Sequence, residues 1–509
     1  MDVTQILMLI TILVYLAAMV GIGAVLAKQS QTTDDFYLGG RTLGPLVTAM
    51  SAEASDMSSW LLMGLPGVAY LSGTADAAWT AIGLAIGTYV NWLVVAKRLR
   101  NYTHVCGNST TLPLFFSNRY RDNKRILSVI AALLIIIFFV PYTASGFAAC
   151  GKLFANLFGM DYLPAMLISA IVIVAYTTLG GFLAASTTDF VQSIVMTIAI
   201  VVVFGFGISK VGSFSAVMDN AKSMAGYFSL THTHDVATGT ASPYSLLQIF
   251  STLAWGLGYF GMPHVLLRFM AIGDANKLKL SRRVATVWVV ISMAVSVFIG
   301  VIGNAMTKAG VLPTLKDPET IILVVADLIS KHGVLATIIA GLILAGILAA
   351  TMSTADSQLL AASSSASQNI LKEVFMKDMS EKTGMLIARI TVLVIALIGV
   401  FIARNPDSSV FQIVSFAWAG FGASFGPLVL LALFWKRSTF QGALCGMVSG
   451  GVMVFVWKFL IRPMGGALGI YELLPAFLLG LAVNVIVSLL TPAPSREVQD
   501  EFDKVASMK

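Results

Sequence analysis

Long uninterrupted apolar runs are the feature that most constrains how this chain can fold. About 20 consecutive apolar residues cross the hydrocarbon core of a bilayer as a helix. Backbone polar groups at that depth must be satisfied within the segment, which excludes open sheets. The sequence contains about thirteen such runs, over residues 3–27, 45–72, 77–96, 126–157, 163–183, 188–212, 245–272, 284–307, 333–365, 385–403, 410–435, 440–461 and 471–490. These runs predict an all-α, polytopic membrane protein.

Composition and charge placement agree with this prediction. The chain is 57% hydrophobic and 11% charged, whereas soluble domains carry about 25% charged residues. Most of the 32 Lys and Arg residues fall on one side of the predicted topology. The positive-inside rule makes that side cytoplasmic. We therefore expect a plasma (inner) membrane protein with its N-terminus outside and its C-terminus in the cytoplasm, without a nucleic-acid partner or an obligatory protein partner.

The second predicted span contains a polar stretch, SAEASDMSSW, at residues 51–60. It places two carboxylates, Glu53 and Asp56, at mid-bilayer depth. A charged side chain at a helix centre costs about 2.5–3.5 kcal/mol on insertion scales, and such residues usually mark an ion or substrate pathway. The stretch therefore predicts a functional site within the membrane.

Two of the predicted spans are interrupted, at residues 51–59 and 255–263. The second interruption holds three glycines and a proline within nine residues, which disfavours a regular helix. Transporters often bind solute where helices of two inverted repeats are broken at corresponding positions. Five spans separate the starts of the two segments, and an odd number inverts their orientation. The pattern favours a solute site at the breaks; the alternative is two kinked packing helices.

A third polar segment lies at residues 345–358, AGILAATMSTADSQ. On a helix, Ser353 and Ser357 share one face. Hydroxyls there, with unwound carbonyls at Ala54 and Met57, suit a weakly held monovalent cation such as Na⁺, whereas a divalent ion favours more carboxylates. The alternative is helix–helix packing through small residues.

These segments resemble the sodium/solute symporter family. The matching stretches are LGGRTLGP at 38–45, ASDMS at 54–58, WLLMGLPG at 60–67, residues 255–270, MST at 352–354 and FAWAGFG at 416–422. The resemblance extends from the first span to the last, and its motifs are those of the proline-transporting branch. It implies a LeuT-type core of five-plus-five inverted repeats and Na⁺-coupled uptake of L-proline by alternating access, with Na⁺ as the coupling ion.

The resemblance also implies site residues. The implied sodium ligands are the carbonyls of Ala54, Met57 and Ala350 and the hydroxyls of Ser353 and Thr354, with Asp56 matching an acidic residue that sodium coupling requires. The implied proline site comprises Ser58, Ser59, Tyr142, Trp255, Tyr259 and Pro263. In this interpretation, two aromatic rings one helical turn apart enclose the pyrrolidine ring. A half-helix that starts near Ser58 directs free N–H groups at the carboxylate.

The chain departs from the family at two carboxylates. Glu53 stands where better-known members carry a small residue, and two interpretations stay open: it faces a water-filled cytoplasmic pathway, or it is protonated. Asp356 stands where some proline-transporting relatives have Ser. With Asp189 and Ser357, it falls where certain members place an extra sodium ion, which makes the three residues a candidate second cation site. The alternative is a cytoplasm-facing carboxylate paired with a basic loop residue.

We expect five regions: an N-terminal extra helix and cytoplasmic loop (1–44), a first five-helix repeat (45–212), an extracellular loop (213–244), a second five-helix repeat (245–435), and C-terminal helices with a cytoplasmic tail (436–509). Two other functions stay open, namely Na⁺- or H⁺-coupled symport of another small amino acid or carboxylate, and a transporter-like solute sensor. An enzyme is not expected, because no catalytic pair such as HExxH is present in the sequence.

Overall fold

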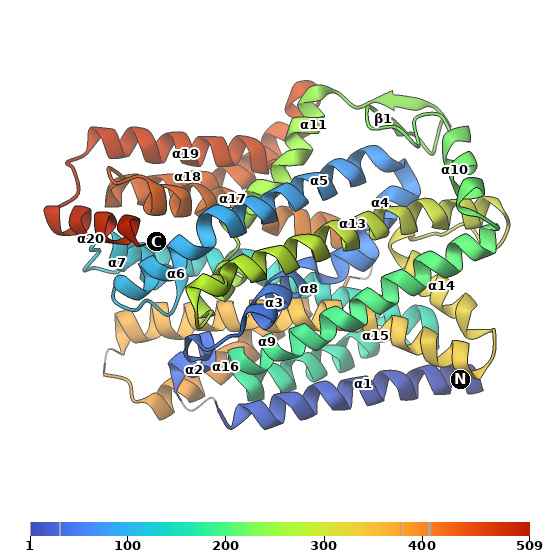
Figure 1. Ribbon diagram of the computed structural model, residues 1–509, viewed down its shortest axis with the longest axis horizontal. Coiled ribbons are helices and arrows are strands. Elements are labelled where there is room, and N and C mark those ends of the chain that lie inside the picture. The colour runs from blue at the N-terminus through green and yellow to red at the C-terminus, as the bar shows by residue number, and fades with distance from the viewer. Residues whose placement is uncertain (1, 30–31, 377, 406–408, 509) are drawn as a thin grey trace.

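The computed structural model describes residues 2–29, 32–376, 378–405 and 409–508. Most of the long helices run in roughly the same direction, side by side (Figure 1). The labels α2, α6, α7 and α20 gather at one end of the bundle, and α10 and β1 lie at the other. The N and C marks stand at opposite ends, as an odd number of spans requires.

The chain up to residue 211 contains nine of the described α-helices. They are α1 (Val3–Ala27), α2 (Thr33–Leu38), α3 (Pro45–Ser59), α4 (Leu65–Ser72), α5 (Thr74–Val90), α6 (Ala96–Val105), α7 (Leu112–Arg119), α8 (Ile126–Phe158) and α9 (Tyr162–Val211). A short antiparallel hairpin follows α10 (Phe214–Ser223) and pairs β1 (His232–His234) with β2 (Ala241–Pro243).

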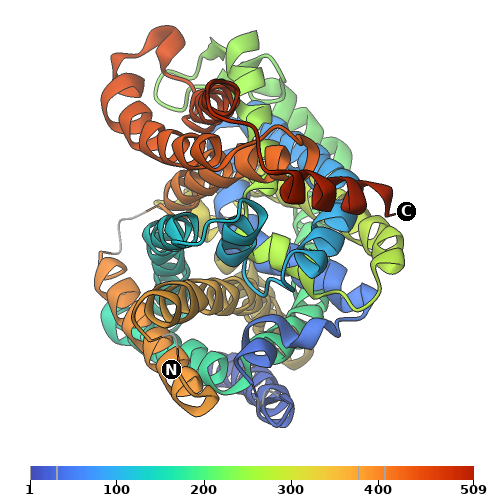
Figure 2. The same cartoon turned by 90° about the vertical axis from the view of Figure 1, so that its left-hand side faces the viewer.

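The chain from residue 246 onward is also helical. It contains α11 (Leu246–Leu253), α12 (Pro263–Ala271), α13 (Leu278–Lys308), α14 (Ile321–Ser330), α15 (Val334–Ser364), α16 (Glu381–Ile402), α17 (Val410–Phe434), α18 (Phe440–Val456), α19 (Leu473–Leu490) and α20 (Arg496–Ser507). Short 3₁₀ and π-helical segments link several of them. Figure 2 views the bundle from the end that carries α20, so that many helices are seen end-on.

Ten helices among the described residues are long and apolar enough to cross a membrane. The three other predicted spans are the two interrupted ones and the first part of α9, where only Tyr162–Ala175 is a shorter apolar helix. The direction of α9 breaks at Gly181, whose φ of 62° is readily adopted only by glycine. The predicted all-α membrane fold is confirmed, and the arrangement is consistent with thirteen spans.

The first predicted interruption lies at Ser58. Its φ of 49° and ψ of −173° end the regular helix of α3, and a π-helical turn over Trp60–Gly64 leads into α4. A serine with positive φ is uncommon and costs energy, so surrounding contacts must hold it. One such contact is the hydrogen bond that the backbone N–H of Trp60 donates to Ser58 Oγ at 3.0 Å.

The second interruption separates α11 from α12. A 3₁₀ segment over Ala254–Phe260 follows α11, and Met262 is extended. Pro263 then begins α12, a position at which its missing N–H is not needed. Both predicted breaks are therefore present, and helices α5, α8, α15 and α17 pack around them.

The C-terminal helix α20 is amphipathic and docks on the bundle. Its buried residue Phe502 lies against the ring of Tyr102, with a centroid distance of 6.4 Å. On its polar side, Glu497 and Glu501 accept from Arg121 Nη2 at 3.0 and 2.9 Å. These two carboxylates raise the pKa of the Arg121 guanidinium above its ordinary value. The tail is thus a packed element and not a loose extension.

Candidate functional site

A small cavity lies between the two interrupted helices. Its volume of about 10 Å³ is room for at most one water molecule. The residues that line it come from both breaks and from α5, α8 and α17: Asp56, Met57, Trp60, Leu84, Tyr142, Trp255, Val414 and Trp418. The two predicted breaks therefore meet at one site.

Aromatic rings cover this cavity. The Trp255 ring stacks on Tyr471 at 5.1 Å and lies 5.5 Å from Trp60 and 5.6 Å from Phe411, measured between centroids. Trp418 Nε1 donates to the carbonyl of Trp255 at 2.8 Å and thereby fixes the 3₁₀ segment against α17. Closely packed rings of this kind exclude water and supply large apolar contact area.

Asp56 connects the two broken helices. Tyr259 donates its hydroxyl proton to Asp56 Oδ2 at 2.7 Å, and Tyr142 donates to the Asp56 carbonyl at 3.1 Å. The other oxygen, Oδ1, is buried and has no hydrogen-bond partner among the described residues. The side chain thus points toward the cavity and Tyr259, with one acceptor still available to a ligand.

The six residues predicted for the proline site divide into two groups. Tyr142 and Trp255 line the cavity. Ser58, Ser59, Tyr259 and Pro263 are buried around the breaks but do not line it in this conformation. The cavity has four further lining residues that the site prediction did not include: Trp60, Leu84, Val414 and Trp418. Trp60 and Trp418 lie in the motifs that resemble the family, so the sequence could have indicated them as site residues. Leu84 and Val414 are ordinary apolar residues outside those motifs, and nothing in the sequence distinguishes them from other residues of the spans.

The predicted sodium ligands come from α3 and α15, and four of them lie together. Ser353 Oγ donates to the carbonyl of Ala54 at 2.8 Å and to that of Ala350 at 3.2 Å. Thr354 Oγ1 donates to the same Ala350 carbonyl at 3.1 Å. Met57 follows Ala54 by one turn, where α3 ends. Two hydroxyls and two carbonyls in mutual contact form an oxygen-rich, uncharged cluster of the kind that suits Na⁺.

The candidate second cation site is built around a guanidinium. Arg268 Nη2 bonds Asp189 Oδ2 at 3.1 Å and Ser357 Oγ at 2.6 Å, and Nε donates to Ser51 Oγ at 2.9 Å. Ser357 in turn donates to Asp356 Oδ1 at 3.0 Å. The predicted residues are brought together, and Arg268, which was not among the predicted site residues, already supplies a positive charge between them.

Glu53 faces α5 and the π-helical segment Asn91–Val95 that follows it. The side chain is fully buried. Thr88 Oγ1 and Trp92 Nε1 both donate to Oε1, at 3.0 and 2.8 Å. Oε2 has no hydrogen-bond partner among the described residues. In this conformation Glu53 therefore lies against α5 and does not face a water-filled space.

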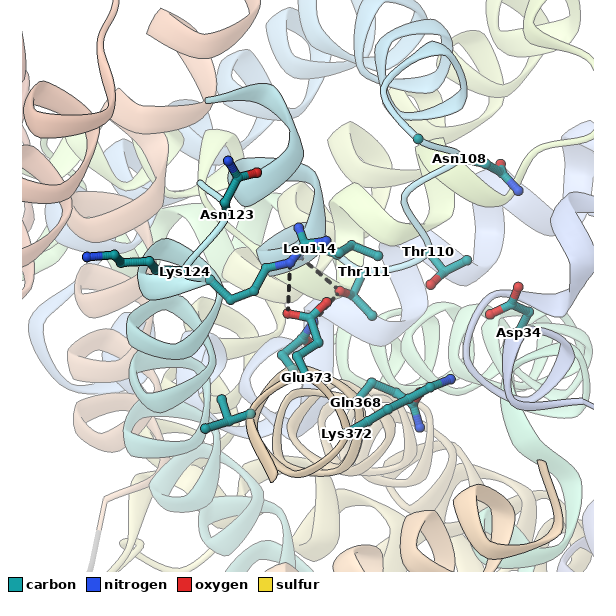
Figure 3. Close-up of a pocket in the computed structure, with 14 residues that line it drawn as sticks. Asp34, Asn108, Thr110, Thr111, Leu114, Asn123, Lys124, Gln368, Lys372 and Glu373 are labelled. Carbon is teal, nitrogen blue, oxygen red and sulfur yellow. Dashed lines mark hydrogen bonds and ion pairs between the residues drawn. The ribbon is translucent and has the colours of Figure 1, made fainter. Parts of the chain in front are cut away.

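A second, larger cavity of about 940 Å³ opens at the end of the bundle that carries α2 and α7. Figure 3 shows that its labelled side chains come from α2, from the segment around α7 and from the π-helical turns that continue α15. Asn369 Nδ2 donates to Thr111 Oγ1 at 3.0 Å, and Arg125 forms a 3.9 Å ion pair with Glu373. Burial, together with the nearby Glu381, raises the pKa of Asp34 on its rim.

The chain is similar to proline transporters over nearly its whole length. Residues 36–450 match the Sodium:solute symporter family. The osmoregulated proline transporter OpuE of Bacillus subtilis (strain 168) is 40% identical over 489 residues, which cover 96% of each protein. The sodium/proline symporter of Escherichia coli (strain K12) is 41% identical over 500 residues, which cover 97% of this chain and 95% of that relative.

The fold is similar to that of a solved transporter. A Na⁺-coupled sialic acid symporter in a substrate-bound outward-open state superposes with a TM-score of 0.79 at 19% identity, and the match covers 96% of this chain and 99% of the other. The likeness confirms the predicted fold, an all-α bundle of membrane-spanning helices. Because the family match spans most of the sequence and the relatives are about 40% identical over nearly all of it, this chain belongs to the sodium:solute symporter family.

Proposed function

We propose that this protein takes up L-proline with Na⁺ across the plasma membrane. The observation that carries the proposal is that α3 contributes to both predicted sites: Ala54 to the oxygen cluster, and Asp56 and Met57 to the aromatic cavity. A cation and a solute bound to one interrupted helix affect each other's affinity, which is what coupled transport requires. The names of the relatives support proline as the solute.

The proposed Na⁺ site consists of the carbonyls of Ala54, Met57 and Ala350 and the hydroxyls of Ser353 and Thr354, with Asp56 nearby. A hydroxyl that donates to a carbonyl can rotate, so that both oxygens point at an ion. The existing Ser353–Ala54 and Thr354–Ala350 hydrogen bonds therefore mark oxygens that are already close enough to share a cation.

The proposed proline site is the aromatic cavity, together with the residues buried around the breaks (Ser58, Ser59, Tyr259 and Pro263). Proline does not fit in a cavity of about 10 Å³, so binding requires the rings to separate. The large cavity at the α2 end then serves as the cytoplasmic route, and alternating access moves the repeats 45–212 and 245–435 relative to each other. In this proposal, the N-terminus lies outside the cell and the C-terminus lies in the cytoplasm.

One Na⁺ per proline is the stoichiometry that this arrangement supports. Asp189, Asp356 and Ser357 stay the candidate for a second cation, but the Arg268 guanidinium lies within 3.1 Å of both Asp189 and Ser357. A cation entering there would meet a like charge at close range, which is unfavourable in a low-dielectric interior.

Uptake into proteoliposomes tests the proposal. Purified protein is expected to accumulate radiolabelled L-proline when an inward Na⁺ gradient is imposed, and to lose this activity when choline replaces Na⁺. Unlabelled cyclic imino acids should compete, whereas alanine, glycine and glutamate should not. Equal competition by alanine would favour another small amino acid as the solute. Accumulation driven by a proton gradient without Na⁺ would favour H⁺ coupling, and binding without accumulation would favour a sensor.

A further inference from the structure

An apolar groove with a charged end lies on the side of the bundle, between α3, α9 and α13. Its volume is about 500 Å³, and the three helices pack against one another in pairs. Figure 1 shows α9 and α13 side by side. Met50 on α3 and Ile200 on α9 are buried in the groove, whereas Val287 and Ile291 on α13 are more than half exposed at its rim. The groove therefore opens toward the surrounding bilayer and is separate from both proposed binding sites.

The length of the groove matches one leaflet of a bilayer. One face of α13 lines it, with residues 283, 284, 287, 288, 291 and 292 at helical spacing. From Arg283 to Ser292 this face extends about 13 Å, because a helix rises by about 1.5 Å per residue. Half of the hydrocarbon core of a bilayer is about 15 Å thick. The groove thus extends from Arg283 at one end to near the middle of the membrane.

The polar atoms inside the groove already have partners in the protein. Trp288 Nε1 donates to Thr197 Oγ1 at 2.9 Å, and Thr197 Oγ1 donates to the carbonyl of Ser193 at 2.7 Å. Ser292 Oγ donates to the carbonyl of Val289 at 3.2 Å. A polar solute would lose its hydrogen bonds to water here without gaining others, which is costly. The interior of the groove therefore favours a hydrocarbon chain.

The charged end of the groove is Arg283. Its side chain is exposed, and it has no hydrogen-bond or ion-pair partner among the described residues. Residues 277–283, KLKLSRR, contain four basic residues and no acid. The segment Ala275–Lys277 before α13 contacts α6, at the end of the bundle that also carries α20. Basic clusters directly cytoplasmic of a spanning helix attract anionic lipid headgroups.

We propose that this groove binds an anionic phospholipid of the inner leaflet, with its phosphate at Arg283 and one acyl chain against Trp288 and Met50. Such a lipid matches the apolar interior, the length of the groove and the unpaired cation at its end. An apolar helix from a second copy of the chain would fill the groove but would leave the guanidinium without an anion. The charge therefore favours the lipid.

A lipid in this groove contacts the helix that carries the proposed sites. Met50 precedes Ala54, a proposed Na⁺ ligand, by about one turn of α3. The beginning of α3 is held on α13 by the hydrogen bond that Ser281 Oγ donates to the carbonyl of Pro45 at 2.7 Å. Occupancy of the groove and the position of this half-helix are therefore linked. Binding of the lipid itself does not depend on which ion or solute the protein transports.

Quenching of tryptophan fluorescence tests the proposal on delipidated, full-length protein in detergent. The probes are phosphatidylglycerol and phosphatidylcholine with brominated acyl chains, which quench indoles that they contact. The difference between the unmutated protein and Trp288→Phe isolates the contribution of the tryptophan in the groove. We expect saturable quenching of Trp288, with phosphatidylglycerol acting at a concentration about tenfold or more below that of phosphatidylcholine, as for one contact to a charged group.

Two variants separate the charge from the apolar interior. Arg283→Gln should reduce the affinity for phosphatidylglycerol to that for phosphatidylcholine. Its matched control is Arg282→Gln, which removes the same charge one residue away; Arg282 lies 5.6 Å from the ring of Tyr89 and does not line the groove. This control should keep the preference for phosphatidylglycerol. Val287→Phe adds volume at the rim and should weaken the binding of both lipids.

Three results would overturn the inference. Equal quenching by the two lipids in the unmutated protein would exclude a headgroup site, and an equal loss in Arg282→Gln and Arg283→Gln would show only general charge attraction. Quenching of Trp288 that rises without saturation would mean that bulk lipid or detergent covers the groove, and a dimer mass under those conditions would assign it to a second copy. Failure of proline uptake would overturn the proposed function and leave this measurement unaffected.

Discussion

Single residues around the breaks combine strain with unused hydrogen-bonding capacity. Ser58 holds a positive φ that serine seldom adopts, and Asp56 and Ser59 each keep a buried oxygen without a partner among the described residues. Strained backbone and unsatisfied polar atoms cluster at functional sites, where a ligand can satisfy them. The residues that define the oxygen cluster and the cavity are therefore the ones to change first.

The hydroxyls of Ser353 and Thr354 are expected to bind Na⁺. Ser353→Ala and Thr354→Ala each remove one ligand, so the Na⁺ concentration for half-maximal proline uptake should rise about tenfold, as for the loss of one hydrogen bond to a charged group. Proline binding at saturating Na⁺ should change less. The control is Ser364→Ala, whose hydroxyl donates to the Ala361 carbonyl within α15. Unchanged Na⁺ dependence in both variants would make these hydroxyls packing groups.

Trp255 forms the wall and cover of the cavity. Its truncation in Trp255→Ala removes apolar contact worth roughly 1–3 kcal/mol, so proline affinity should fall about tenfold or more. The variant should also discriminate less between proline and alanine, because the wall that fits the ring is absent. Competition binding with labelled proline measures both effects, with the half-buried Trp79→Ala as control. Wild-type affinity and selectivity would show that Trp255 does not contact the solute.

At the scale of elements, the start of α17 carries Phe411, whose ring lies against Trp255 over the cavity. Glu319 accepts from the backbone N–H groups of Val410 and Phe411 at 3.2 and 3.1 Å, and from Lys152 Nζ at 3.2 Å. A carboxylate at a helix N-terminus is stabilising, and this one is largely buried with its cation. It therefore joins α8, α17 and the segment before α14 on the side where Phe411 meets Trp255.

Glu319→Gln is expected to loosen this closure. Losing one partner of a buried ion pair costs about 3–5 kcal/mol when the other charge is left unpaired. Lys152 keeps its 2.9 Å pair with Asp317 in this variant, so the cost should be smaller, and conformations with an exposed cavity should become more frequent. A cysteine at Val414, which lines the cavity, should react with an impermeant thiol reagent at least about tenfold faster from the outside. Asp327→Asn, which breaks an exposed ion pair with Lys331, is the control. Equal rates would exclude Glu319 from closure.

Two variants in the C-terminal helix α20 compare apolar with ionic contributions to the free energy of unfolding. Phe502 is buried against Tyr102 and lies 4.8 Å from the Arg98 guanidinium, so Phe502→Ala should destabilise the protein by about 3–5 kcal/mol. Glu497 is exposed, and Glu497→Gln should cost at most about 1 kcal/mol. Thermal unfolding in detergent, followed by tryptophan fluorescence, compares the two. A larger effect of the Glu497 change would contradict this ranking.

For the whole molecule, the decisive expectation is orientation. The N and C marks lie at opposite ends of the bundle (Figure 1), and the charge asymmetry predicts that the C-terminal end faces the cytoplasm. In a Cys445→Ala background, where the other two cysteines are buried, an impermeant maleimide should label Asp2→Cys on intact cells and leave Ser507→Cys unlabelled until the membrane is permeabilised. Labelling of both on intact cells would contradict an odd number of spans.

The sequence by itself determined the spans and the two breaks. The length of an apolar run and the presence of helix-disfavouring residues are local properties. A run of about 20 apolar residues therefore predicts a span, and a Gly-rich stretch ending in Pro263 predicts a break, without any knowledge of the packing. The same holds for the candidate Na⁺ hydroxyls, because Ser353 and Thr354 lie in one recognisable segment. These predictions needed only helical geometry and the family-like motifs.

Tertiary structure alone decided which partners the buried charges take. Arg268 meets Asp189 and Ser357 across 79 and 89 residues of sequence, and Glu53 meets Thr88 and Trp92 across 35 and 39. It also decided that only two of the six predicted proline-site residues line the cavity. Such pairings depend on how long helices pack and rotate against one another. That outcome is the sum of many weak contacts along each helix, and no local sequence pattern records it.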